Sequence, residues 1–196
     1  AYDLPNTLGV PGESLPHVVH YYREAHAYYR RRVVIVGGKN SAAEAALELH
    51  RSGSDVTLVH RRPQLGESIK YWVLPDIENR IKEGSIKALF NAQVTEIRPT
   101  EVLVTHEGER TSLPADAVLL LTGYQADTSL FERCGIAYNA ETCEPEFNPE
   151  TLETQVDGLY VVGAVQTGRN SGRIFIENGR FHGEHVVGVI AKRASV

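Results

Sequence analysis

The sequence predicts an α/β fold built on a parallel sheet, and three observations carry that prediction. Short, continuous runs of aliphatic residues occur at 33–36 and 117–121, and such runs are typical of parallel strands buried on both faces; Asp55-Val-Thr-Leu-Val59 predicts a further buried strand. A glycine pair, Gly37-Gly38, follows the first run directly. Residues 41–51, rich in Ala, Leu and Glu, then favour a helix. Strand, glycine turn, helix and strand in this order form a βαβ unit.

The remaining elements are assigned in chain order. Residues 1–32 are a lead-in with turn-forming prolines and glycines, followed by a short helix within 17–30. Gly53 is placed to end the helix 41–51 in a left-handed conformation. A second helix is expected over 71–83, with Pro75 in its first turn, and a strand over 86–90.

The C-terminal half has weaker patterns. Residues 93–97 and 101–105 alternate in polarity and predict a hairpin, so the parallel sheet gains a β-hairpin or meander as a third layer. Residues 125–157 are loop-rich, 159–162 predict a last short strand, and 173–193 carry a helical pattern.

Composition excludes several functional classes. The 196 residues carry 20 Lys plus Arg and 25 Asp plus Glu, a net charge of −5, which argues against nucleic acid or an anionic membrane as partner. No apolar run approaches the roughly 20 residues that span a bilayer, and the N-terminus shows no secretion signal. Two cysteines, Cys134 and Cys143, are too few for a disulfide scaffold and are interpreted as ordinary thiols. We expect a cytoplasmic protein.

The turn after the first strand resembles a dinucleotide-binding fingerprint. In a Gly-x-Gly-x-x-Gly/Ala turn, small residues allow a tight turn and close backbone approach to a pyrophosphate, which the helix N-terminus then binds. The middle position departs from this pattern, because Lys39 stands where the second glycine is usual, and it adds a positive charge. The predicted pyrophosphate site comprises Gly37, Gly38, Lys39, Asn40, Ser41 and Ala42. A glycine-rich turn without a ligand is the alternative.

The end of the second strand indicates which nucleotide is bound. An acidic residue there accepts a bond from the ribose 2′-hydroxyl of NAD, whereas arginine attracts the 2′-phosphate of NADP. His60, Arg61 and Arg62 stand at this position, and no acid does. We therefore predict NADP(H) binding; two surface arginines with no ligand are the alternative.

With these residues in hand, the chain resembles the bacillithiol-disulfide reductase family of thioredoxin-reductase-like flavoproteins. The resemblance is carried by residues 37–42, by Ile69-Lys70 with Leu74-Pro75-Asp76, and above all by residues 174–183. It implies a Rossmann-like NADPH-binding domain over 33–123, set within an FAD-binding domain to which 1–32 and 124–196 contribute. It also implies that Thr122 and Gly123 border the nicotinamide, that Gly163 and Ala164 lie at the flavin, and that NADPH and FAD together reduce bacillithiol disulfide, a small-molecule substrate.

The chain departs from the family pattern in three ways, and each changes what we expect of its activity or its cofactor contacts. No FAD-binding βαβ unit precedes residue 33, so we expect the C-terminal part of a longer enzyme that binds NADP(H) without turnover by itself. The stretch His20–His26 lacks the Cys-x-x-Cys of thioredoxin reductases. Ala164 stands where an aspartate usually contacts the flavin ribitol.

Several alternatives stay open from the sequence. A ferredoxin- or flavodoxin-NADP reductase of the same fold, or a stand-alone NADP(H)-binding module without catalysis, would share the nucleotide motifs. We predict no catalytic side chain in this chain and no metal site, since no further ligand accompanies His182 and His185. A homo-oligomer is compatible with the sequence.

Overall fold

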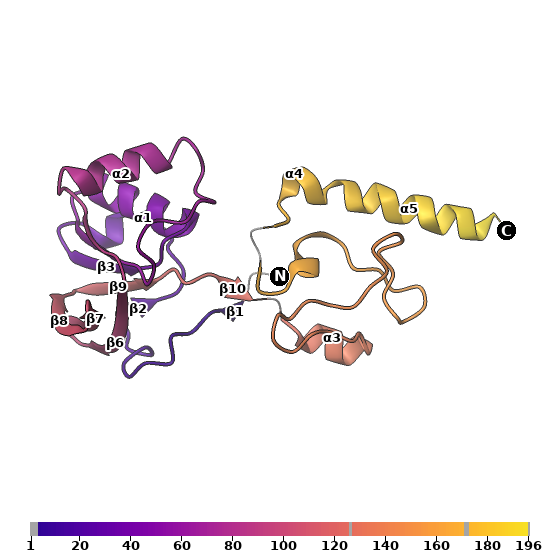
Figure 1. The fold of residues 1–196 in the computed structure, drawn as a ribbon, viewed down its shortest axis with the longest axis horizontal. Coiled ribbons are helices and arrows are strands. Elements are labelled where there is room, and N and C mark those ends of the chain that lie inside the picture. The colour runs from indigo at the N-terminus through magenta and orange to yellow at the C-terminus, as the bar shows by residue number, and fades with distance from the viewer. Residues whose placement is uncertain (1–3, 126, 171–172, 196) are drawn as a thin grey trace. The chain divides into compact units, whose positions relative to one another are not determined.

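The computed structural model describes residues 4–125, 127–170 and 173–195; the remaining positions of the predicted domain ranges lie outside it. The chain divides into two compact units (Figure 1). One is Thr7–Thr122, and the other joins the N-terminal residues up to Asn6 with Gly123–Val196. The first unit thus begins well before residue 33, where the sequence placed its start.

The first unit is built on a five-stranded parallel sheet with the order β2-β9-β3-β4-β5. Its central strand β3 (Arg32–Val36) buries all four apolar residues, as the continuous run predicts. The other strands are β9 (Ala117–Leu120) and β4 (Asp55–Val59), which flank β3, and β2 (Val18–Val19) and β5 (Lys87–Leu89) at the edges. The predicted parallel sheet is confirmed.

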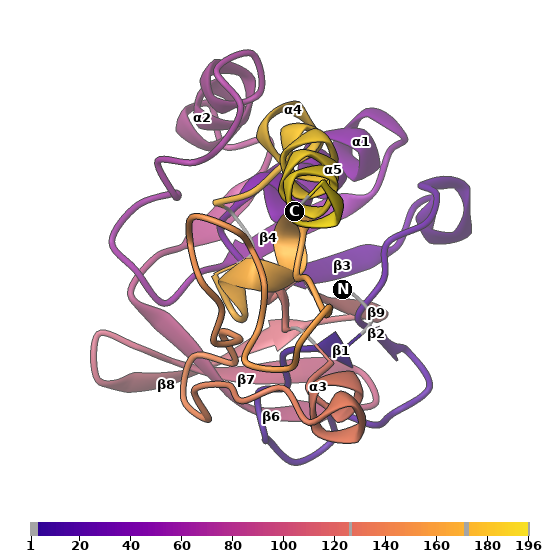
Figure 2. The ribbon, with the colours of Figure 1, turned by 90° about the vertical axis from the view of Figure 1, so that its right-hand side faces the viewer.

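Two further layers cover this sheet (Figures 1 and 2). Val33 and Ile35 pack in one core with helices α1 and α2, while Val34 and Val36 pack in another with an antiparallel sheet. Alternate residues of one strand thus face opposite layers. The helices are α1 (Asn40–Arg51) and α2 (Leu74–Lys82), and the antiparallel strands are β6 (Ala92–Arg98), β7 (Glu101–His106) and β8 (Glu109–Pro114). The predicted three-layer α/β architecture is confirmed, and β8 extends the hairpin to a meander.

The helix predicted within residues 17–30 is wrong. Val18–Val19 form β2 and pair in parallel with β9, and only a single 3₁₀ turn, η1 (His26–Tyr28), follows. The backbone N–H of Ile97 also donates to the carbonyl of Pro11 at 2.8 Å. Sheet pairing thus overrides the local helical pattern and fastens the part of the lead-in after Asn6 to the first unit.

The second unit contains few regular elements. A short ladder joins β1 (Leu4–Pro5) to β10 (Tyr124–Gln125), and the helices are α3 (Ser129–Cys134), η2 (Gly163–Thr167), α4 (Ile176–Gly179) and α5 (Phe181–Ala194). The strand predicted at 159–162 is wrong: among the described residues Tyr160 makes one isolated bridge, to Glu153, and residues 159–162 form no continuous strand.

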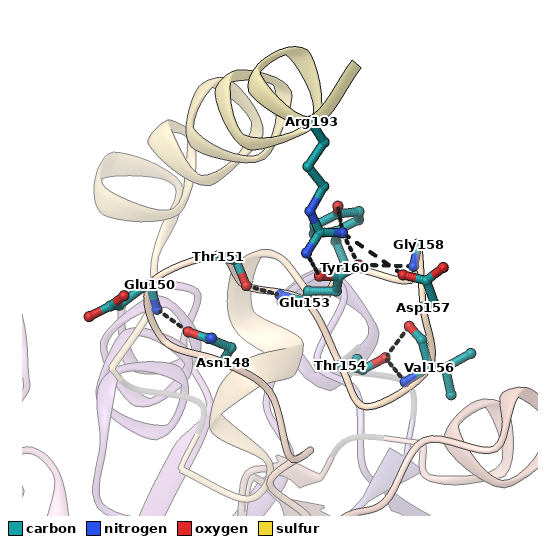
Figure 3. Close-up of polar contacts among 10 residues, drawn as sticks. All are labelled: Asn148, Glu150, Thr151, Glu153, Thr154, Val156, Asp157, Gly158, Tyr160 and Arg193. Carbon is teal, nitrogen blue, oxygen red and sulfur yellow. Dashed lines mark hydrogen bonds and ion pairs between the residues drawn. The ribbon is translucent and has the colours of Figure 1, made fainter. Parts of the chain in front are cut away.

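An ion pair attaches α5 to the loop before η2 (Figure 3). Glu153 is only 9% exposed, and its carboxylate accepts bonds from the Arg193 guanidinium and from the Gly158 N–H at 2.9 Å. These bonds lower the pKa of Glu153 below its usual range. The buried carboxylate is therefore held in its charged form.

Candidate functional site

The candidate site lies at the carboxyl edge of the parallel sheet in the first unit. The chain leaves β3 through α1 to β4 on one side, whereas β9 pairs with β3 on the other, so the direction of strand order reverses beside β3. Ligands of open α/β sheets bind in the crevice at such a switch point. The residues that follow β3, β4 and β9 share this edge: Gly37 to Ala42, His60 to Arg62, and Thr122.

The two glycines of the turn are required by close packing within the chain. A Cβ on Gly37 would lie 2.6 Å from the Leu121 carbonyl oxygen and 2.9 Å from the Ala42 Cβ. A Cβ on Gly38 would lie 2.4 Å from ring atoms of His60. The turn therefore has the tight backbone and the small helix-facing residue that the fingerprint predicts.

The first turn of α1 has backbone amides available to an anion. Lys39 precedes the helix in an extended conformation, and its carbonyl accepts the bond from the Ala43 N–H at 3.0 Å. Within the described part of the chain no side chain caps this end. Lys39 and Ser41 are exposed. The helix dipole and the Lys39 ammonium both favour negative charge here.

Two exposed guanidinium groups follow β4. Two backbone hydrogen bonds fix the chain at this point. The His60 N–H donates to the Leu89 carbonyl at 2.8 Å, and the Asn91 N–H donates to the Arg62 carbonyl at 3.0 Å. Neither Arg61 nor Arg62 forms an ion pair with any described carboxylate. A fixed backbone with two unpaired arginines suits bidentate binding of a phosphate.

His60 packs its ring beneath Gly38. Burial lowers the pKa of His60, and the charges of Arg62 and Arg61 lower it further. Its Nε2 atom is buried, with no hydrogen-bond partner among the described residues. The imidazole is therefore neutral near pH 7, and its ring packs against Gly38 in the turn.

Asn40 has a position that sequence reasoning did not anticipate. Its side-chain amide contacts the loop that carries the arginines, through the Ser68 carbonyl and the Lys70 N–H. Ser68, which accepts this bond, and Gly66, whose N–H donates to the Gly38 carbonyl, carried no sequence signal. Only their proximity to the glycine turn in the fold identifies them.

The other predicted residues lie in the second unit. Gly123 has φ +90°, and its carbonyl accepts from the Asn6 N–H at 2.9 Å. Gly163, with φ +76°, donates its N–H to His182 Nδ1 at 3.1 Å at the start of η2. Ala164 follows in the same turn. Cys134 and Cys143 are free thiols. Over the described ranges, no helix has the length and apolar character needed to cross a bilayer.

Comparison with known proteins agrees with this fold. Residues 1–163 match the family model described as pyridine nucleotide-disulphide oxidoreductase. The chain is 46% identical over 193 residues to a bacilliredoxin reductase of Bacillus subtilis, covering 98% of this chain and 60% of that protein. Bacillithiol disulfide reductase structures from Bacillus cereus and Staphylococcus aureus superpose with TM-scores of 0.94 and 0.91, at 41% and 38% identity.

These structures cover 98% of this chain, and the chain in turn covers 60% and 61% of theirs. The chain thus spans about three fifths of the length of its relatives. The resemblance to bacillithiol-disulfide reductases seen in the sequence is confirmed. The chain belongs to the pyridine nucleotide-disulphide oxidoreductase family.

Proposed function

We propose that this chain is the NADPH-binding part of an FAD-dependent oxidoreductase that reduces a low-molecular-weight thiol disulfide, bacillithiol disulfide. One observation carries the nucleotide assignment: the uncapped first turn of α1 and the unpaired Arg61 and Arg62 lie at one edge of the sheet. The names of the relatives from Bacillus and Staphylococcus support the substrate.

The residues at this edge fit NADPH by their chemistry. A Cβ at Gly37 or Gly38 would overlap protein atoms, so the tight turn that leads into α1 requires glycine at both positions. The amides of residues 40–42 and the Lys39 ammonium would bind the pyrophosphate, and Arg61 and Arg62 the 2′-phosphate. Thr122 and Gly123, after β9, are proposed to border the nicotinamide. The bound nucleotide supplies a hydride.

The second unit is proposed to be part of the FAD-binding domain, with Thr7–Thr122 as the NADPH-binding domain. Gly163 and Ala164 would lie at the flavin in the full-length protein. The Ala164 methyl group offers no acceptor for a ribitol hydroxyl, so the flavin must draw its polar contacts from other residues. We propose a cytoplasmic location, in keeping with two free thiols.

Titration calorimetry of the chain with NADPH and with NADH tests the nucleotide assignment. We expect clear preference for NADPH, because only its 2′-phosphate can pair with Arg61 and Arg62. Equal affinities contradict the assignment. For the whole enzyme, NADPH oxidation with bacillithiol disulfide is compared with oxidation in the presence of ferredoxin. Faster turnover with ferredoxin contradicts the proposed substrate.

A further inference from the structure

The loop between β4 and α2 is bound to the first turn of α1 by the side chain of Asn40. Its Nδ2 donates to the Ser68 carbonyl at 2.9 Å, and its Oδ1 accepts from the Lys70 N–H at 2.8 Å. In a parallel sheet, one residue bonds in the same way to the two residues that flank its neighbour. The Asn40 amide thus acts towards this loop as a peptide group of an adjacent strand would.

Other contacts hold the same loop in place. The Gly66 N–H donates to the Gly38 carbonyl at 2.7 Å, and the Lys70 ammonium pairs with Glu44 of α1 at 2.8 Å. Leu65 and Ile69 are buried in the core shared with α1. Residues 61–64, in contrast, are exposed. The loop is therefore anchored over residues 65–70, directly after the segment that carries both arginines.

We propose that the side chain of Asn40 positions the loop that sets nucleotide specificity and does not itself bind the nucleotide, whereas its backbone N–H stays available to the pyrophosphate. This inference rests on the proposed function, since it concerns the same NADPH site. Asn40 belongs to the turn assigned to the pyrophosphate, and it fixes the loop assigned to the 2′-phosphate. A loop that is ordered before binding avoids the conformational entropy that binding would otherwise cost.

The chain contains its own reporter of this loop. Trp72 is the single tryptophan and lies two residues after Lys70. The Lys70 ammonium lies 5.6 Å from the centre of the Trp72 ring, and the Tyr71 ring meets it edge-on at 4.8 Å. Trp72 fluorescence therefore reports the order of the loop without any nucleotide.

The experiment compares the 196-residue chain with Asn40→Ala and with Asn148→Ala as control. Asn148 also bonds a nearby backbone amide, the Glu150 N–H at 2.8 Å, but it lies in the second unit (Figure 3). Trp72 anisotropy is measured without nucleotide, and dissociation constants are measured for NADPH and NADH. In Asn40→Ala we expect lower anisotropy and a fall of about tenfold in the preference for NADPH, the effect of one charge-assisted bond. The control should change neither quantity.

A second variant acts on the same loop at Gly66, where it contacts the glycine turn. A Cβ on Gly66 would lie 3.1 Å from the Gly38 carbonyl oxygen, so Gly66→Ala should push the loop outwards and lower the NADPH preference in the same direction. If Asn40→Ala does not fold, Gly66→Ala replaces it in the same measurements. An unchanged preference in the folded variant, with a wild type that prefers NADPH, overturns the inference and leaves the proposed function intact. A wild type without preference overturns the proposed function itself.

Discussion

A Cβ on Gly38 would lie 2.4 Å from the ring of His60, so the turn after β3 and the end of β4 exclude any side chain between them. Gly37 is equally restricted by the Leu121 carbonyl, which is backbone and cannot rotate away. The glycine turn is therefore defined first by packing within the chain. Nucleotide binding would use the start of α1, where Lys39 and Ser41 are exposed and which this packed turn positions.

Gly37→Ala should destabilise the fold by about 1–3 kcal/mol, the usual cost of overpacking a tight site. The free energy of unfolding from urea titration measures this change. Gly188→Ala in α5 is the control, because a Cβ there meets no atom within 4 Å. Helix propensity predicts that the control is neutral or more stable by up to about 1 kcal/mol. Equal destabilisation of both variants contradicts the packing argument.

Arg61→Ala and Arg62→Ala should each weaken NADPH binding by about 1–3 kcal/mol, because each removes a charge-assisted hydrogen bond to the 2′-phosphate, while NADH binding stays nearly the same. Calorimetric titration with both nucleotides measures the two effects. Arg110→Ala removes the same charge from an exposed position on β8 and serves as control. An unchanged NADPH affinity in both test variants would place the 2′-phosphate elsewhere.

The pH dependence of stability should contain a contribution from His60. The pKa of His60 is lowered in the folded chain, so on acidification the unfolded chain binds a proton at a higher pH than the folded chain does. Stability attributable to His60 is therefore full above the ordinary histidine pKa of about 6.5 and falls as the pH drops below it. His60→Phe keeps a ring in place and removes the titration. Chemical unfolding at pH 7.5 and pH 5.5 should show a smaller loss in the variant; identical losses contradict the prediction.

Asp116 should stabilise the first unit near neutral pH, and this contribution should be lost in acid. Hydrogen bonds from the Arg32 side chain and from its N–H at 2.9 Å hold the pKa of Asp116 well below its ordinary value. The stability from this depressed pKa is present above the unfolded value of about 3.9 and is lost as the pH falls towards the folded value. Asp116→Asn should thus lower Tm at pH 6 and flatten its decline towards pH 3. Parallel Tm curves for variant and wild type would exclude this role.

The apolar pattern along the chain was sufficient to predict the strands that are buried on both faces of the sheet. Val33–Val36 and Ala117–Leu120 are apolar on both faces, and this property fixed their place in a two-sided sheet. Residues 109–114 were missed because the sheet leaves most of β8 exposed, and an exposed strand needs no alternation of apolar residues. Val18–Val19 were misassigned because their pairing partner lies about a hundred residues away.

The same distinction holds for the site. The glycine turn and the arginines could be found from spacing along the chain, since both follow strands of one βαβ unit. The contact of Asn40 with Ser68 and Lys70 could not, because it joins two loops whose proximity only the folded sheet creates. Asn40 was predicted only as part of the pyrophosphate turn; that prediction stays open for its backbone N–H, while its side-chain amide contacts the neighbouring loop.

The most direct test of the NADPH site is an amide chemical-shift titration of the ¹⁵N-labelled chain with NADP⁺ and with NAD⁺. Both nucleotides should shift the amides of residues 40–42 at the start of α1. Only NADP⁺ should also shift those of Arg61 and Arg62, and the amides of β6–β8 on the opposite layer should stay in place. Shifts confined to the β6–β8 layer, or the same pattern at Arg61 and Arg62 with both nucleotides, would contradict the account.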